Sequence, residues 1–253
     1  MKIDNHCHCA GCAVASILLK HIQAKFDNYP GIIWINQLGE AFTIKDIFAQ
    51  IGVTDSEKIT EKLLDIKADE TCWRNFPNFR LKFIPCGLPT LRDAFLRTDN
   101  MNGGEWYGDI IKEVYFNVKA TGCQGVELRI TIHGRYLYEW VELAKCDESF
   151  KKASGRNTDV DSYGSYLRNV FAPLFENSAK DLSKMTPDEV VLSDCLARVK
   201  GFDSVGEEEV NETFVGEWED PDDWITNKKP PYHYELFHLF SNMAKLNSLR
   251  RYH

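Results

Sequence analysis

Two histidines separated by one residue, His6 and His8, are the side chains best suited to metal chemistry near the start of the chain. Side chains of a β-strand alternate between its two faces, so residues i and i+2 point the same way. If residues 2–8 form a strand, both imidazoles converge on one point at its end. Neutral imidazole is a good ligand for zinc and related divalent metals. The spacing therefore predicts half of a metal site, and the alternative interpretation is a pair of satisfied polar residues at a strand end.

The eight cysteines are spread over the chain and offer a second candidate for metal binding. Cys9 and Cys12 form a Cys-x-x-Cys beside the two histidines, as in small soft-metal modules. No second cysteine pair lies at zinc-finger distance, which disfavours such a module. Cys7 points away from the histidines in a regular strand and is expected in the core. Without a secretory signal the thiols are expected to stay reduced, so a cytoplasmic protein is predicted.

The bulk composition is that of a globular protein. Its 253 residues include 43% hydrophobic side chains, which is enough to bury a sizeable core. The net charge of −8 disfavours nucleic-acid binding, although a local basic pocket for a small anion is compatible with it. No segment approaches the roughly 20 apolar residues that a membrane span needs. Residues 206–223 carry nine acidic residues and no lysine or arginine, and this acidic loop is expected to be solvated.

The elements that must position the histidines alternate between short strands and longer helical segments. The strands are predicted at residues 2–8, 126–132 and 197–204. The helical patterns cover residues 12–26, 44–48, 90–96, 106–120, 138–150, 163–175 and 232–251. The last helix carries an apolar stripe at Leu236, Leu239, Phe240, Met243, Leu246 and Leu249. Long helical crossovers between strands imply a parallel sheet and an α/β fold.

Five parts of the sequence carry a resemblance to a known family. They are residues 2–8 (Lys-Ile-Asp-Asn-His-Cys-His), 91–100 (Leu-Arg-Asp-Ala-Phe-Leu-Arg-Thr-Asp-Asn), 127–135 (Glu-Leu-Arg-Ile-Thr-Ile-His-Gly-Arg), 201–205 (Gly-Phe-Asp-Ser-Val), and 227–232 leading to 246–251. Together they resemble the AMP deaminase family, in the adenosine/AMP deaminase branch of the metal-dependent amidohydrolases. They occur in the family's order and roughly its spacing, over nearly the whole chain.

The resemblance implies a (β/α)8 barrel of the TIM type, of which residues 1–253 are one incomplete N-terminal domain with about three strands. It implies zinc as cofactor and hydrolysis of the 6-amino group of AMP to give IMP and ammonia. In the family, zinc is held by a first-strand His-x-His, a His from a His-Cys-Gly-Glu segment and an Asp from an Asp-Asp-Pro segment. Carried over, His6 and His8 are metal ligands at the C-terminal end of a barrel strand, and His8 also belongs to the substrate site.

The family's AMP-binding stretch, of the form Lys-Phe-Asn-x-Lys-Tyr-Asn-Pro, is similar to residues 78–85. The substrate-binding residues that this implies are Asn78, Phe79, Arg80, Leu81, Lys82 and Phe83. Lys82 matches the family pattern, whereas Asn78 replaces a lysine and Phe83 replaces a tyrosine. Arg80 restores positive charge, and arginine is a good phosphate partner. Phe83 cannot donate the hydrogen bond that a tyrosine could.

The sequence contains neither His-Cys-Gly-Glu nor Asp-Asp-Pro. No catalytic residue is therefore present, and the general acid, the family's Glu, is expected beyond the C-terminus. The first hypothesis is an AMP deaminase of purine metabolism seen as an incomplete catalytic domain, with AMP as its small-molecule partner and a homo-oligomer as its full-length form. The second is a non-catalytic nucleotide-binding or regulatory relative.

Several charged or aromatic residues near the predicted elements allow more than one role. Glu127, Arg129 and Arg135 fit either support of an active site or salt bridges between barrel strands. Three further histidines are interpreted as structural, namely His133, His233 and His238. Three strands of an eight-stranded barrel would leave sheet edges exposed, so the isolated chain is expected to be poorly soluble or oligomeric.

Overall fold

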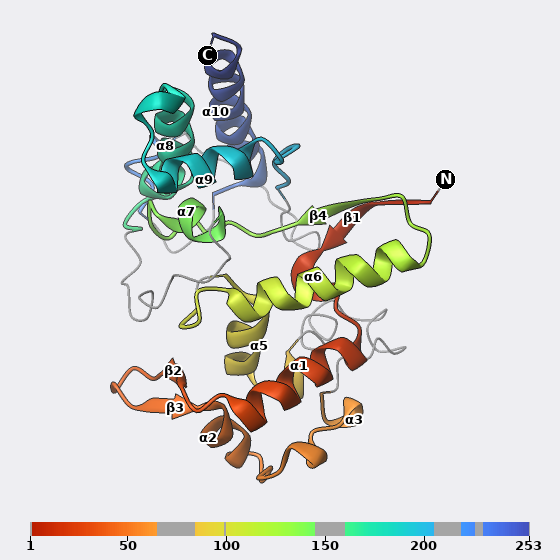
Figure 1. Ribbon diagram of the computed structural model, residues 1–253. Helices are drawn as coiled ribbons and strands as arrows, with labels where there is room; N and C mark the ends of the chain where they lie inside the picture. Colours follow the sequence, from red (N-terminus) through yellow and green to blue (C-terminus); the bar gives the residue numbers. More distant parts are fainter. Residues whose placement is uncertain are drawn as a thin grey trace. The chain divides into compact units, whose positions relative to one another are not determined.

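The computed structural model describes residues 2–64, 84–98, 100–144, 160–204, 219–225 and 230–252, and its architecture is mixed α/β (Figure 1). Contacts between Cα atoms group these residues into two compact units, one up to Ile130 and one from Thr131 onward. Each unit has its own buried apolar cluster. The two histidines of the predicted metal site belong to the first unit.

The first unit contains a parallel pair of strands, β1 (Ile3–His8) and β4 (Gly125–Arg129). Figure 1 shows the two strands side by side, with helices intervening in the chain between them. The predicted strand at residues 2–8 and the predicted parallel sheet are confirmed, and the structure shows that the partner of this strand is the one beginning at Gly125. Strand β4 ends at Arg129 rather than at residue 132, because its partner β1 ends at His8, which pairs with Arg129.

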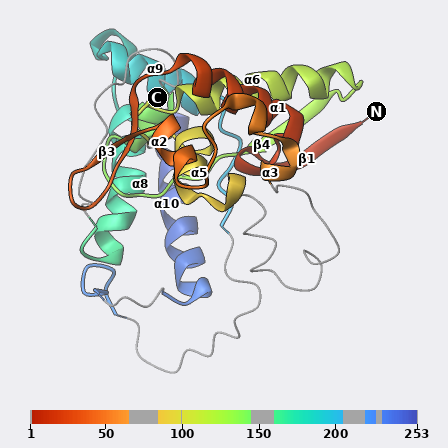
Figure 2. The same cartoon turned by 90° about the horizontal axis from the view of Figure 1, so that it is seen from below.

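Two helices, α1 (Ala15–Asn28) and α6 (Glu105–Ala120), pack together in this unit and lie side by side in Figures 1 and 2. A 3-10 turn, Cys9–Gly11, connects β1 to α1. Helix α5 (Pro89–Leu96) packs against α6. The helical periodicity predicted for these segments is confirmed, and their apolar faces form one cluster with Cys9, Ile17, Leu18, Ile22, Phe26, Leu91, Phe95, Trp106 and Ile110.

A hairpin and short helices complete the first unit. Strands β2 (Ile32–Ile35) and β3 (Ala41–Thr43) pair antiparallel, and this hairpin was not predicted. Its turn is held by Asn36, whose side-chain oxygen accepts hydrogen bonds from the backbone N–H groups of Leu38 and Glu40. The short helices are α2 (Ile44–Ala49), α3 (Glu61–Leu64) and the 3-10 turns Ser56–Lys58 and Pro85–Gly87.

The second unit is helical in its described part. It consists of α7 (Glu139–Ala144), α8 (Tyr163–Ser178), the 3-10 turn Leu182–Lys184, α9 (Pro187–Leu196) and α10 (Tyr232–Tyr252). The buried cluster of this unit comprises Trp140, Val170, Phe171, Leu174, Leu192, Leu196 and Leu246. The indole N–H of Trp140 donates to the backbone oxygen of Val170 at 2.8 Å, which fixes α7 against α8.

The predicted strand at residues 197–204 is wrong. These residues follow α9 as a turn and irregular chain, and the ring of Phe202 stacks on Phe171 of the helical core. Helix α9 precedes them because Thr186 caps it in a capping box with Glu189, and Pro187 occupies its first turn. The apolar residues Val199 and Phe202, which indicated a strand, therefore pack against the buried cluster of the second unit.

Helix α10 confirms the predicted final helix, but its apolar stripe is only partly buried. Leu246 is buried, Leu239 and Met243 are half-buried, and Leu236 and Phe240 are exposed. Tyr234 does not belong to the stripe, but its side chain is buried. None of the helices in the described ranges combines the length and the apolar character that crossing a membrane requires.

Candidate metal centre

His6 and His8 lie in the second half of β1 with their imidazole rings facing each other. The two Nε2 atoms are 2.9 Å apart, and the ring centroids are 4.8 Å apart. Both side chains are exposed, so nothing in the described structure covers the approach to them. The spacing of two residues thus brings two imidazole nitrogens to a common point, as expected from the alternation of a strand.

This geometry is compatible with two of the ligand positions of a zinc ion. Two nitrogens bound to tetrahedral zinc at about 2.0–2.1 Å lie about 3.3 Å from each other. The observed separation of 2.9 Å is slightly shorter, because one ring can donate its Nε2–H to the other. A small rotation of either ring would open the pair to the zinc separation, so the residues present fit this part of the group.

Two imidazoles do not complete a zinc site. Across the residues that the structure describes, no group of three or more His, Cys, Asp or Glu side chains is arranged to hold a metal ion. Structural zinc sites use four protein ligands and catalytic sites use three with an open position. The pair therefore needs at least one further ligand from outside the described ranges.

The neighbouring cysteines do not supply that ligand. Cys9 is fully buried among the apolar residues of α1 and α6, and burial raises the pKa of its thiol to about 11. Burial likewise raises the pKa of Cys12 to about 12, and its thiol donates to the backbone oxygen of Cys9 at 3.2 Å. Metals bind the thiolate, which these environments disfavour. Cys7, expected in the core, is half-buried, and burial raises its thiol pKa as well.

The strand beside the histidines contributes Arg129 to the same end of the sheet. Arg129 pairs with His8 in the register of β1 and β4. Its Nη2 atom donates to the backbone oxygen of Asn5 at 2.9 Å and lies 3.8 Å from the Glu127 carboxylate. The contact with Glu127 lies within β4 and is not the salt bridge between strands that the sequence left open, whereas the hydrogen bond to Asn5 joins β4 to the strand of the histidines.

Arg135 and His133 belong to a different arrangement, in the second unit. The carboxylate of Glu139 is buried and accepts hydrogen bonds from the backbone N–H groups of His133 at 2.5 Å and Arg135 at 3.1 Å. Glu139 thereby pins the loop that precedes α7. Gly134, in the same loop, has a positive φ of 62°, and an added Cβ would meet the ring of Tyr166 at 2.5 Å.

The remaining predicted histidines also have structural contacts. His238 on α10 packs edge-on against Tyr234 at a centroid distance of 4.5 Å and against Tyr163 at 5.9 Å. His233 is exposed on the same helix. One histidine with a polar partner was not singled out from the sequence: His21 of α1 lies 2.9 Å from the Glu113 carboxylate of α6. Only knowledge that α1 and α6 are neighbours could have paired them.

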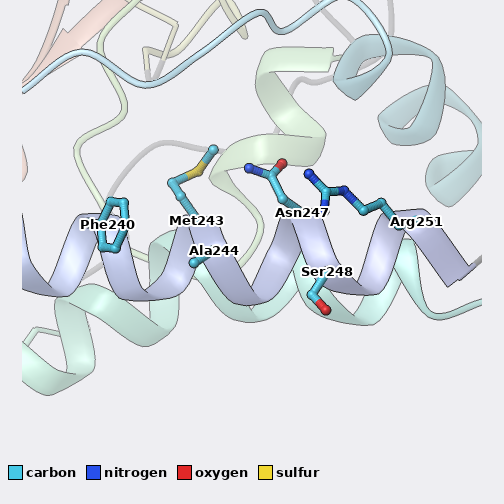
Figure 3. Close-up of a pocket in the computed structure, with 6 residues that line it drawn as sticks. All are labelled: Phe240, Met243, Ala244, Asn247, Ser248 and Arg251. Carbon is cyan, nitrogen blue, oxygen red and sulfur yellow. The ribbon is translucent and has the colours of Figure 1, made fainter.

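The predicted substrate-binding residues lie outside the described ranges, apart from His8. They are Asn78, Phe79, Arg80, Leu81, Lys82 and Phe83. A pocket of about 360 Å³ lies on α10 in the second unit (Figure 3). Its lining includes Met243, Asn247 and Arg251, one helical turn apart. Neither His6 nor His8 belongs to the lining that the structure describes.

Comparison with known proteins identifies the family. The model of the AMP deaminase family matches residues 1–253. The chain is 30% identical to the AMP deaminase of Dictyostelium discoideum over 98% of its own length and 33% of that protein. It is 33% identical to the AMP deaminase of Schizosaccharomyces pombe, over 99% of the chain and 31% of the relative. For AMP deaminase 3 of Rattus norvegicus the values are 31%, 99% and 34%.

The chain therefore belongs to the AMP deaminase family, as the resemblance of its five segments indicated. It spans about a third of the length of the curated relatives that it matches. The enzymes named in these comparisons are whole proteins, and their activity applies to this chain only as a proposal.

Proposed function

We propose that this chain is part of a zinc-dependent AMP deaminase, in which His6 and His8 supply two metal ligands. The observation that carries the proposal is the convergence of the two imidazole Nε2 atoms in a chain of the AMP deaminase family. The reaction is the hydrolytic deamination of AMP to IMP in purine nucleotide metabolism, with the nucleotide as small-molecule partner. The cytoplasm is the compartment that reduced thiols favour.

In this proposal β1 and β4 are two parallel strands of an incomplete (β/α)8 barrel that extends over residues 1–253 as one domain. Their pairing and the long helical connection between them support it. The histidines then lie at the C-terminal end of a barrel strand, where such folds keep their chemistry. Closed barrels require more strands, and the full-length protein would supply them and assemble into a homo-oligomer.

Some residues of the chain would bind the metal, and others would bind the substrate. His6 and His8 would hold zinc through Nε2. That requires the proton shared in the 2.9 Å contact to leave and both rings to carry hydrogen on Nδ1. A zinc ion held there would supply an activated water for attack on the purine ring. Arg80 and Lys82 add positive charge for the phosphate of AMP, and His8 also lies in the substrate site.

A second candidate function is a non-catalytic nucleotide-binding or regulatory relative. One observation favours it: in the described part of the chain no third metal ligand accompanies the two histidines. A two-histidine site binds metal weakly and exchanges it readily, so it would not hold an activated water in place.

The test is ammonia release from AMP by the protein isolated from its own cells, before and after zinc removal with a chelator. We expect turnover that disappears with zinc and returns when zinc is added. A His8→Ala variant is expected to lose turnover, and an exposed His233→Ala variant is expected to keep it. A zinc-loaded protein that leaves AMP unchanged would reject the catalytic proposal in favour of the non-catalytic one.

A further inference from the structure

The pairing of β1 with β4 is interrupted at the candidate metal centre. Ile3 and Asp4 pair with Gly125 and Val126, and after the interruption Cys7 pairs with Leu128. Two residues of β1, Asn5 and His6, therefore face a single residue of β4. This is a β-bulge, which bends a strand locally and re-aims its side chains, and bulges are frequent beside active sites.

His6 is itself one of the two bulged residues. Its backbone N–H turns to the carboxylate of Asp4, at 3.1 Å from Oδ1. The imidazole ring of His6 contacts the ring of His8. His8 lies after the bulge, where the regular pairing resumes, and it pairs with Arg129. The distance between the two Nε2 atoms thus depends on the backbone conformation of the bulged residues Asn5 and His6.

Arg129 holds the other half of the bulge. Its Nη2 atom donates to the backbone oxygen of Asn5 at 2.9 Å, across the two strands. The Arg129 side chain is 30% exposed and Asn5 is exposed, so this contact lies at the surface. A guanidinium that donates to a backbone carbonyl makes a charge-assisted hydrogen bond, stronger than one between neutral groups. The side chain of Arg129 therefore donates to the backbone oxygen of Asn5, the residue immediately before His6, as a backbone N–H of a neighbouring strand would.

We propose that Arg129 is a positioning residue of the metal centre, which fixes the bulge at Asn5 and thereby holds His6 in the direction of His8. This inference rests on the proposed zinc binding by the two histidines. Arg129 touches neither the metal nor the substrate in this role. Its effect passes through the backbone, in the way that outer-shell groups orient metal ligands.

The experiment is a Zn²⁺ titration of the purified protein against a coloured competing chelator. Arg129→Met keeps most of the apolar stem of the side chain but removes all its donors, and we expect about a 10-fold weaker zinc affinity, the low end of the range for outer-shell changes. Arg129→Lys can donate one hydrogen bond to Asn5 and is expected to recover part of the affinity. Arg92→Met on α5, an exposed arginine in the same unit, is the matched control and should bind as the wild type does.

The outcomes separate this inference from the proposed function. If Arg129→Met binds zinc as tightly as the wild type while His6→Ala loses binding, the positioning role is wrong and the zinc site stands. If the wild type and His6→Ala bind zinc equally weakly, both the positioning role and the zinc site are wrong. Circular dichroism and melting temperature are recorded for each variant. Should Arg129→Met not fold, Arg129→Gln, whose side chain is too short to reach Asn5, replaces it, and wild-type affinity in that variant overturns the inference.

Discussion

At the scale of single residues, protonation separates the histidines from the cysteines around them. Imidazole can bind a metal as a neutral group, whereas a thiol must first lose its proton. The exposed rings of His6 and His8 remain accessible, and burial keeps Cys9 and Cys12 in the protonated form. The Cys-x-x-Cys beside the histidines is therefore part of the core packing of α1.

Alkylation should show that the thiols of Cys9 and Cys12 are protonated in the native protein. With pKa values of about 11 and 12, only about one in a thousand Cys9 thiols, and fewer at Cys12, is ionised at pH 8. We expect iodoacetamide to leave both unmodified in the native protein and to modify them after denaturation, as read by peptide mass spectrometry. Rapid native labelling at Cys9 would contradict the buried environment described for it.

The sequence predicted the residue-level geometry where it depends on one strand alone. The alternation of side chains placed His6 beside His8 without any knowledge of the rest of the fold. The contact of Arg129 with Asn5 could not be predicted, because it requires the register of two strands that are more than a hundred residues apart in the chain. The bulge that creates the contact leaves no signal in either segment.

At the scale of elements, the helices with a regular apolar face were predicted, the short helix α2 among them, and helix α9 and the hairpin β2–β3 were missed. Helices α1, α5 and α6 bury regular apolar faces, so their periodicity was visible. Helix α9 was missed, although Thr186, Pro187 and Glu189 together indicate the start of a capped helix. The hairpin β2–β3 is two short strands joined by a turn that Asn36 organises through its side chain, and its apolar run Ile-Ile-Trp-Ile has no alternation.

The junction of α5 and α6 depends on one buried side chain, Asn100. Its amide nitrogen lies 2.8 Å from the backbone oxygen of Arg97 and 2.9 Å from that of Asp93, and its oxygen accepts from Gly104 N–H at 2.9 Å. Asn100→Ala should lower the free energy of unfolding by about 2 kcal/mol, because buried backbone groups lose their partners. Urea denaturation measures this loss. Asn28→Ala, which removes one exposed contact on α1, should cost well under half as much.

Helix α10 should respond to pH through His238. Burial against Tyr163 and Tyr234 lowers its pKa below the ordinary value of 6.5, with Asp220 opposing the shift. The fold therefore favours neutral His238, so its stabilising contribution is present above about pH 6.5 and is lost as the pH falls through the lowered value.

Melting temperatures at pH 8 and pH 5 test this response. His238→Phe keeps the ring contacts but cannot take up a proton, so it should lose less stability on acidification than the wild type. Leu236→Met, an exposed apolar position on the same helix, should leave the wild-type pH dependence unchanged. An identical pH dependence in the wild type and in His238→Phe would remove His238 as its source.

At the scale of the whole molecule, apolar surface remains uncovered around the two-stranded sheet. Ile3 is 53% exposed, and Leu128 and Ile130 are also exposed. A parallel pair is normally covered on both faces, and unpaired strand edges invite pairing with other chains. The chain spans about a third of its curated relatives, so the family offers further sequence that could cover these surfaces.

We therefore expect the isolated 253-residue chain to associate with itself. Size-exclusion chromatography with light scattering should show species larger than a monomer at micromolar concentration. Leu128→Lys should reduce the association by charging the open face of β4, whereas Glu57→Lys on an exposed turn should not. A monomer with a sharp two-state melt would contradict this expectation.

The role of the histidine pair is measured most directly by the ratio of zinc to protein in the molecule purified from its own cells, for the wild type and for the His6→Ala/His8→Ala double variant. We expect one zinc ion per chain in the wild type and its loss in the double variant, with the fold retained. Equal zinc content in the two proteins would mean that the histidine pair is not the metal centre.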